Sequence, residues 1–187
     1  MALKQSSTAP PLAAEGISIR VVLPDDRRAL SDFRLAVTPD ARPLRFFSDA
    51  SASRLNGYLQ TPSDGVDHFG VLAQTSDGRI VAHAAYIRLY GPRAELELEL
   101  GDNTDRIALA TALVRELARV ARSRGIRRFV TAGPASNTDV VAQFREGVES
   151  PHPNADGWSV IEFPTAPARE AAEGADPLAS AGATTPA

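Results

Sequence analysis

The stretch that decides the fold is RAELELELGDNTDRIALATALVRELARVARSRGIRRFVT, residues 93–131. Residues 93–100 alternate carboxylates with apolar side chains, and this period of two predicts a strand. Apolar residues then recur with a period of 3.6, which predicts a helix that Gly125 ends, and the stripe consists of Ile107, Ala110, Leu113, Val114, Leu117, Val120 and Ala121. Residues 126–131 form a second apolar strand. The stretch therefore predicts a strand–helix–strand unit with parallel strands.

The region before this unit begins with a strand and two helices. Residues 17–22 alternate between apolar and polar positions, which predicts the first strand. Pro24 and the two carboxylates after it suit the first turn of a helix, and Pro39 ends that helix. Residues 49–59 predict a second, short helix.

Two apolar runs, residues 66–74 and 79–89, follow these helices. The segment Thr75-Ser76-Asp77-Gly78 joins them, and Asp-Gly between two strands is a strong hairpin signal. The Gly91-Pro92 turn then leads into residues 93–100. The sequence therefore predicts an antiparallel meander of three strands that runs directly into the parallel unit.

Two more elements complete the fold: residues 137–146 predict a helix and residues 157–163 predict a last strand. The expected order is βααβββαβαβ, an α/β (α+β) fold with a mixed sheet. Residues 1–15 and 164–187 are polar, rich in alanine and proline, and aperiodic, which is typical of disordered tails. We therefore expect one domain over residues 16–163.

Composition narrows the classes of function. The 187 residues contain no cysteine and three dispersed histidines, so we expect no metal site. A net charge of −3 does not favour nucleic acid as a partner. No segment has the length or apolarity of a membrane span or signal peptide, which predicts a cytoplasmic protein. Lys4 is the only lysine, and this arginine bias is typical of a GC-rich bacterial genome.

Three local segments carry a resemblance to a known family: Pro43-Leu44-Arg45-Phe46-Phe47, Ala94-Glu95-Leu96 and the helix-to-strand junction at residues 124–130. They resemble the GNAT (N-acetyltransferase) superfamily, and in particular its branch of bacterial protein-lysine acetyltransferases. The resemblance covers about residues 17–146. It implies a GNAT-like fold and transfer of an acetyl or other acyl group from acyl-CoA, the co-substrate, to an amine. The acceptor that it implies is a protein lysine or a small-molecule amine.

The resemblance also assigns a candidate catalytic residue. Glu95 matches the glutamate that takes the proton from the acceptor amine in this branch, and a strand carboxylate that faces a cleft suits general-base chemistry. The strand pattern leaves an alternative open, because Glu95, Glu97 and Glu99 share one face that could simply be solvated. A β-bulge near the end of this strand could also redirect Glu99.

Acyl-CoA would lie along the same strand and at the start of the next helix. A helix N-terminus offers unpaired N–H groups and a positive dipole end to pyrophosphate. The positions that match the family's CoA-binding residues are Leu98, Glu99, Leu100, Arg106, Ile107, Ala108, Leu109, Ala110, Thr111 and Asn137.

The helix-start sequence departs from the family pattern at two positions. Asp105 stands where relatives carry glutamine or arginine, and Ala108 stands where they carry glycine. The late helix, residues 137–146, also has no tyrosine to serve as the general acid. The changes at Asp105 and Ala108 predict a degenerate pyrophosphate-binding loop, and the missing tyrosine predicts weakened or altered catalysis. The alternative hypothesis is therefore a GNAT-like domain that no longer catalyses and acts as a binding or regulatory module. His83, inside a strand, is expected to be a packed residue.

Overall fold

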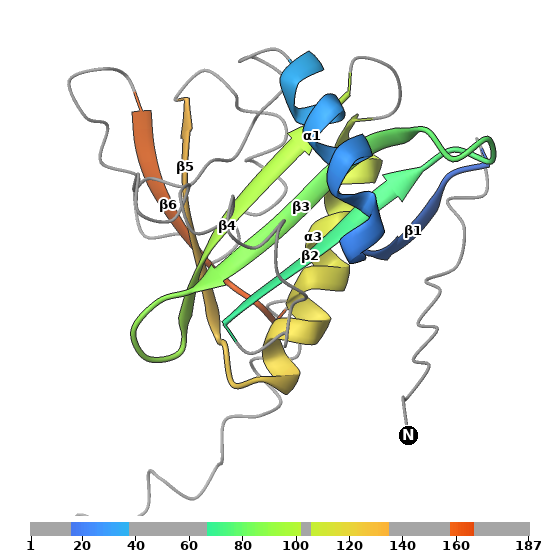
Figure 1. Ribbon diagram of the computed structural model, residues 1–187. Coiled ribbons are helices and arrows are strands. Elements are labelled where there is room, and N and C mark those ends of the chain that lie inside the picture. The colour runs from blue at the N-terminus through green and yellow to red at the C-terminus, as the bar shows by residue number, and fades with distance from the viewer. Residues whose placement is uncertain (1–15, 38–66, 102–105, 135–157, 167–187) are drawn as a thin grey trace, which may run out of the picture.

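The computed structural model describes residues 16–37, 67–101, 106–134 and 158–166, which form one mixed six-stranded sheet with helices on both faces (Figure 1). The strands lie in sequence order, and every neighbouring pair is antiparallel except β4 and β5, which are parallel. The elements are β1 (Ser18–Val21), η1 (Pro24–Asp26), α1 (Arg27–Ala36), β2 (His68–Gln74), β3 (Ile80–Arg88), β4 (Arg93–Leu100), α3 (Arg106–Ser123), β5 (Arg128–Pro134) and β6 (Trp158–Pro164).

The described elements confirm the predicted fold class. The meander β2–β3–β4 and the parallel β4–α3–β5 unit lie where the periodicity predicts them. Gly78, in the hairpin turn, has a φ of 85°, a conformation that residues with a side chain rarely adopt. The helices expected at residues 49–59 and 137–146, the tail at residues 1–15 and residues 167–187 of the expected C-terminal tail lie outside the described residues. Residues 164–166, which the sequence places in that tail, are described: Pro164 ends β6, and Thr165 is buried and donates from its backbone N–H to the carbonyl oxygen of Arg127 at 2.9 Å. In the described part of the chain, no helix has both the length and the apolarity to cross a bilayer.

The two faces of the sheet carry different cores. The apolar stripe of α3 packs on one face, against β4 residues Leu96, Leu98 and Leu100. A row of rings crosses the strands within that core, and it runs Phe69, Tyr86, Phe129, Phe163. The helix α1 covers the opposite face (Figure 1), where a small cluster holds it through Leu30, Leu72 and Ile80. The α3 face therefore contains most of the described apolar core.

The sheet is joined at one end of β4 and β5 and parts at the other. Their parallel ladder has three residue pairs, from Arg93–Arg128 to Glu95–Val130. Beyond Glu95, β4 continues in register with β3 alone, while β5 continues with β6, so the carboxyl ends of β4 and β5 diverge (Figure 1). The joined end is tied by Glu162 of β6, which contacts Arg93 and Arg128 at 2.6 Å each. The strands therefore part immediately after Glu95.

Candidate functional site

The three glutamates of β4 lie on the face that α1 covers, and they are buried. Glu95 and Glu99 have no exposed surface, and Glu97 is 6% exposed. The interpretation of this face as a solvated one is therefore wrong. The shared face itself is confirmed, since the alternating leucines point into the core beneath α3. The possible bulge near Glu99 is also wrong, because the β3–β4 ladder keeps a regular register from Arg88–Ala94 to Ala82–Leu100.

An arginine from α1 reaches the buried carboxylates. Arg34 lies in the last turn of α1, and one guanidinium nitrogen (Nη2) is 3.1 Å from the Oε2 atom of Glu97. Its Nε atom is 3.5 Å from the Oε1 atom of Glu99. The side chain of Arg34 is 17% exposed, so water screens these contacts only weakly. Arg34 therefore joins α1 to the acidic face of β4 by charge.

His83 completes this buried group from the neighbouring strand. It pairs with Glu99 across the β3–β4 ladder, and its Nδ1 atom is 3.1 Å from the Oε2 atom of Glu99. The side chain has no exposed surface. Burial lowers the pKa of His83; Glu99 opposes this shift through its hydrogen bond and charge, and the charge of Arg34 adds to it. His83 is therefore neutral near neutral pH. The expectation that it is packed is confirmed.

The candidate CoA-binding residues divide into core residues and residues at the start of α3. Leu98, Leu100, Leu109 and Ala110 are buried in the core, so only their backbone atoms could contact a ligand. Arg106 is the first residue of α3, and Ile107 is 39% exposed. The hydroxyl of Thr111 donates to the carbonyl oxygen of Ile107 at 2.8 Å, and Ala108 is partly buried beside them. Asp105 and Asn137 lie outside the described residues.

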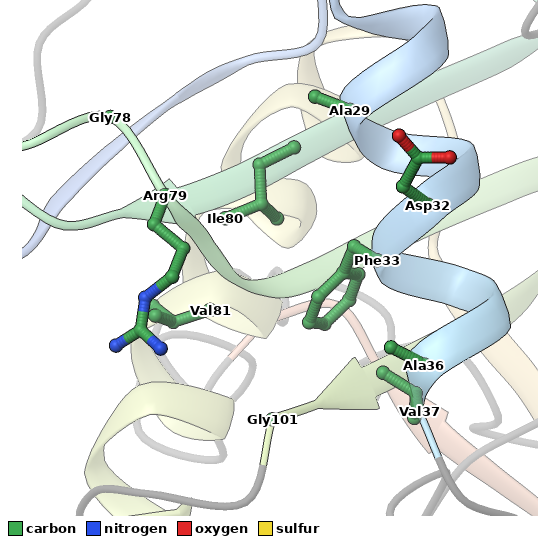
Figure 2. A pocket seen from close by; sticks show the side chains of 10 residues that line it. All are labelled: Ala29, Asp32, Phe33, Ala36, Val37, Gly78, Arg79, Ile80, Val81 and Gly101. Carbon is green, nitrogen blue, oxygen red and sulfur yellow. The ribbon is translucent and has the colours of Figure 1, made fainter.

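A hollow of about 570 Å³ lies between α1 and the start of β3 (Figure 2). Its lining is mostly apolar and includes Phe33, Ile80 and Val81, with Asp32 on the α1 side and Arg79 on the β3 side. Its far edge is Gly101, the residue after β4. The Gly101 N–H donates to the carbonyl oxygen of Val81 at 2.8 Å, and a Cβ at position 101 would lie 2.9 Å from the same oxygen. Glycine is therefore required where β4 ends.

Sequence reasoning missed Arg34 and the pairing of His83 with Glu99. The apolar stripe of the first helix was visible, but the helical pattern does not say which strand a basic side chain reaches. Of the three tyrosines, Tyr86 is buried in the ring row and Tyr90 is 98% exposed in the β3–β4 turn. Within the described ranges, no group of three or more metal-ligating side chains is arranged to hold a cation.

Several solved structures match the fold over about four fifths of the chain. The GNAT domain of S. lividans PAT is 27% identical with a TM-score of 0.61, and the match covers 79% of this chain and 90% of that domain. The PaiA N-acetyltransferase from Thermoplasma acidophilum, solved in complex with coenzyme A, is 13% identical with a TM-score of 0.59, over 79% and 98%. A cAMP-binding acyltransferase from Mycobacterium smegmatis is 20% identical with a TM-score of 0.59, over 86% of this chain and 48% of that one.

The chain has the GNAT fold. No family profile matches the sequence, and no curated protein matches it significantly. The likeness is therefore one of fold.

Proposed function

We propose that this protein is an acyl-CoA-dependent N-acyltransferase that transfers the acyl group directly to an amine, with Glu95 as the general base. The observation that carries the proposal is the position of Glu95, a fully buried carboxylate in the last residue pair before β4 and β5 part. A base at that point lies next to any substrate that binds between the diverging strands. The acceptor is a protein lysine or a small-molecule amine.

Acyl-CoA would lie along the edge of β4 beyond Glu95. The backbone of residues 98–100 would bind the pantetheine arm there, since the side chains of Leu98 and Leu100 belong to the core. The pyrophosphate would lie at the first turn of α3, where N–H groups and the positive end of the helix dipole favour anions. Arg106, the first residue of α3, adds a positive charge at this point.

The reaction requires one proton transfer before the acyl group moves. An alkyl ammonium with a pKa near 10.4 has no free lone pair at neutral pH, so Glu95 accepts a proton from it, directly or through water. The amine nitrogen then attacks the thioester carbonyl carbon. The C–N bond forms and the C–S bond breaks, the nitrogen loses its second proton to solvent, and the thiolate of CoA leaves and takes a proton from solvent. The proton on Glu95 is released to solvent in turn.

The variant Glu95→Gln tests the assignment, because it keeps the shape of the side chain and removes the base. We expect acyl transfer to fall by ~10²–10⁴-fold, while calorimetry shows nearly unchanged acetyl-CoA binding. Glu97→Gln is the matched control, since Glu97 lies two residues along the same face of β4 and should leave more of the rate intact. Equal activity of Glu95→Gln and the unmodified protein would remove Glu95 from the mechanism.

A second function, that of a non-catalytic binding or regulatory module, is favoured by the sequence at the start of α3. Asp105 places a negative charge where the pyrophosphate of CoA would bind. Two like charges ~4–6 Å apart in a partly exposed site cost on the order of 1–3 kcal/mol, which is roughly a 5- to 150-fold loss of affinity. The methyl group of Ala108 would also keep the phosphates away from the backbone.

The double variant Asp105→Gln/Ala108→Gly separates the two functions. It restores the family pattern, so acetyl-CoA should bind at least tenfold more tightly than to the unmodified protein, and the gain should be larger at low salt. The two changes are close together, so their effects need not add. Low-micromolar binding by the unmodified protein would contradict the degenerate-loop hypothesis, and so would a double variant that binds no better.

A further inference from the structure

A β-bulge in β3 determines which face of the sheet His83 occupies. Ala73 of β2 pairs with Ala82 and Gln74 pairs with Ile80, so Val81 is an extra residue in β3. Ile80 lies in the cluster under α1, whereas Val81 and Ala82 both lie in the core under α3. Strict alternation from Ile80 would have put His83 in the apolar core. The bulge shifts the phase by one residue and puts His83 opposite Glu99, on the α1 face.

The contact with Glu99 determines the tautomer of His83. An ionised carboxylate can only accept a hydrogen bond, so the Nδ1 atom of the neutral ring carries the proton and donates to Glu99. The lone pair is then on Nε2, which is buried and has no hydrogen-bond partner among the described residues. Among the described residues, the charge of Arg34 on α1 also acts on the ring, and the apolar Leu72 of β2 is the cross-strand partner of His83.

It costs free energy to fill the space beneath α1 with the buried polar group of Arg34, His83, Glu97 and Glu99. Buried ion pairs often contribute no more stability than apolar side chains of the same volume. A buried nitrogen without a partner adds a further cost. The small apolar cluster of Leu30, Leu72 and Ile80 lies under the same helix, so an apolar filling of this space is available to the fold. The polar filling therefore indicates a role other than stability.

We propose that His83 is a positioning residue of the acyl-transfer site, an inference that rests on the function proposed above. Its Nδ1–H fixes the carboxylate of Glu99, and Glu99 and Glu97 together fix Arg34. Arg34 in turn holds α1 against the face of β4 that carries Glu95. Loss of the bond from His83 removes one of the contacts that orient the carboxylate of Glu99, and the position of Arg34 changes with that carboxylate. The charge beside Glu97, two residues along the same face of β4 from Glu95, and the position of α1 then change together.

Two substitutions test the Nδ1–H bond separately from the volume of the ring. Asparagine can place an amide N–H close to the position of Nδ1, whereas leucine fills the space and cannot donate. His83→Leu should lower kcat with the amine acceptor by ~10–100-fold, the usual effect of losing a residue that orients a functional group. Its KM for acetyl-CoA should stay unchanged. His83→Asn should restore kcat to within about threefold of the unmodified protein, an effect that a purely structural role would not produce.

A measurement on the full-length unmodified protein tests the hydrogen bond without activity. Nitrogen-15 NMR of the imidazole ring should show the neutral Nδ1–H tautomer at about pH 7 to 8. An Nε2–H tautomer would overturn the proposal, and so would full kcat in His83→Leu. If His83→Leu does not fold, a low kcat in a folded His83→Asn overturns it equally. If Glu95→Gln loses activity and His83→Leu does not, the proposed function stands and the role of His83 is ruled out. An unmodified protein that transfers no acyl group would overturn both.

Discussion

The two faces of β4 are equally buried and chemically opposite. Ala94, Leu96, Leu98 and Leu100 have no exposed surface and pack beneath α3. The alternate residues of the same strand are carboxylates, and Arg34 and His83 meet them beneath α1. Burial of the leucine face stabilises the fold through the hydrophobic effect. Burial of the glutamate face removes charges from water and costs free energy.

The comparison separates stability from function within one strand. The leucine face explains why β4 is a central strand with a helix packed on it. The glutamate face contributes little that apolar residues would not contribute, yet it puts Glu95 at the residue pair after which β4 and β5 part. Strongly coupled buried ionisable groups gather at functional sites, which agrees with the base proposed here. Substitutions on the two faces should therefore affect different measurements.

The largest change in stability is expected on the leucine face. Leu98→Ala removes a fully buried side chain from the core and leaves a cavity, which costs about 2–5 kcal/mol in the free energy of unfolding. Denaturant unfolding measures this difference, provided that the m-value, the slope of the free energy of unfolding against denaturant concentration, is the same in both proteins. Leu35→Ala is the matched control, because Leu35 is 83% exposed on α1 and should change stability by about 0.5 kcal/mol or less. Equal costs at both positions would contradict the assignment of the core.

A smaller change in the free energy of unfolding is expected when Arg34, which joins α1 to the glutamate face of β4, loses its charge. Arg34→Met leaves Glu97 and Glu99 buried without this guanidinium, and removal of one partner of a buried pair typically costs several kcal/mol. Arg34 is partly exposed, so we expect about 2–3 kcal/mol in denaturant unfolding. Arg115→Met, on the exposed side of α3, should be nearly neutral. A neutral Arg34→Met would show that the glutamate face does not depend on α1.

The third prediction concerns pH. The pKa of His83 is lowered in the folded protein, chiefly by burial, and returns to about 6.5 when the chain unfolds. The stability linked to His83 is fully present above pH 6.5. It is lost as the pH falls toward the folded pKa, because only the unfolded chain then binds the proton. The loss is at most about 1.4 kcal/mol per pH unit.

His83→Asn should remove this slope of stability against pH, since asparagine does not titrate. The comparison of the two proteins between about pH 5 and 7 isolates His83 from the other groups that titrate there. Identical slopes in both proteins would mean that folding does not change the pKa of His83.

The sequence predicted the elements of the fold because their signals are local. Periods of 2 and 3.6 residues located β4 and α3, and Asp77-Gly78 located the hairpin. The burial of the glutamate face could not be predicted, because it depends on Arg34, which lies on an element far from β4 in the sequence. The bulge at Val81 was hidden for another reason. Apart from His83, residues 80–87 are all aliphatic or aromatic, so no alternation of polar and apolar residues shows the change of phase.

The smallest effect is expected at an ion pair near the surface, which sharpens the contrast with the buried group. Asp26 accepts two hydrogen bonds of 2.6 Å from Arg20 of β1 and one of 2.7 Å from the backbone N–H of Leu23. Burial alone would raise the pKa of Asp26, but the bonds from Arg20 and Leu23 outweigh it and lower the pKa. This stability is therefore present above about pH 4 and lost below it.

Asp26→Asn should cost only about 1 kcal/mol at neutral pH, because water and salt screen a pair that is partly exposed. Asp25→Asn is the matched control one residue earlier, where the exposed side chain should contribute little. The cost at Asp26 should shrink at high salt and vanish in acid, whereas the cost at Arg34 should persist in salt because its partners are buried. A salt response at Arg34 as large as that at Asp26 would mean that solvent reaches the glutamate face, and the contrast between the two faces of β4 would fail.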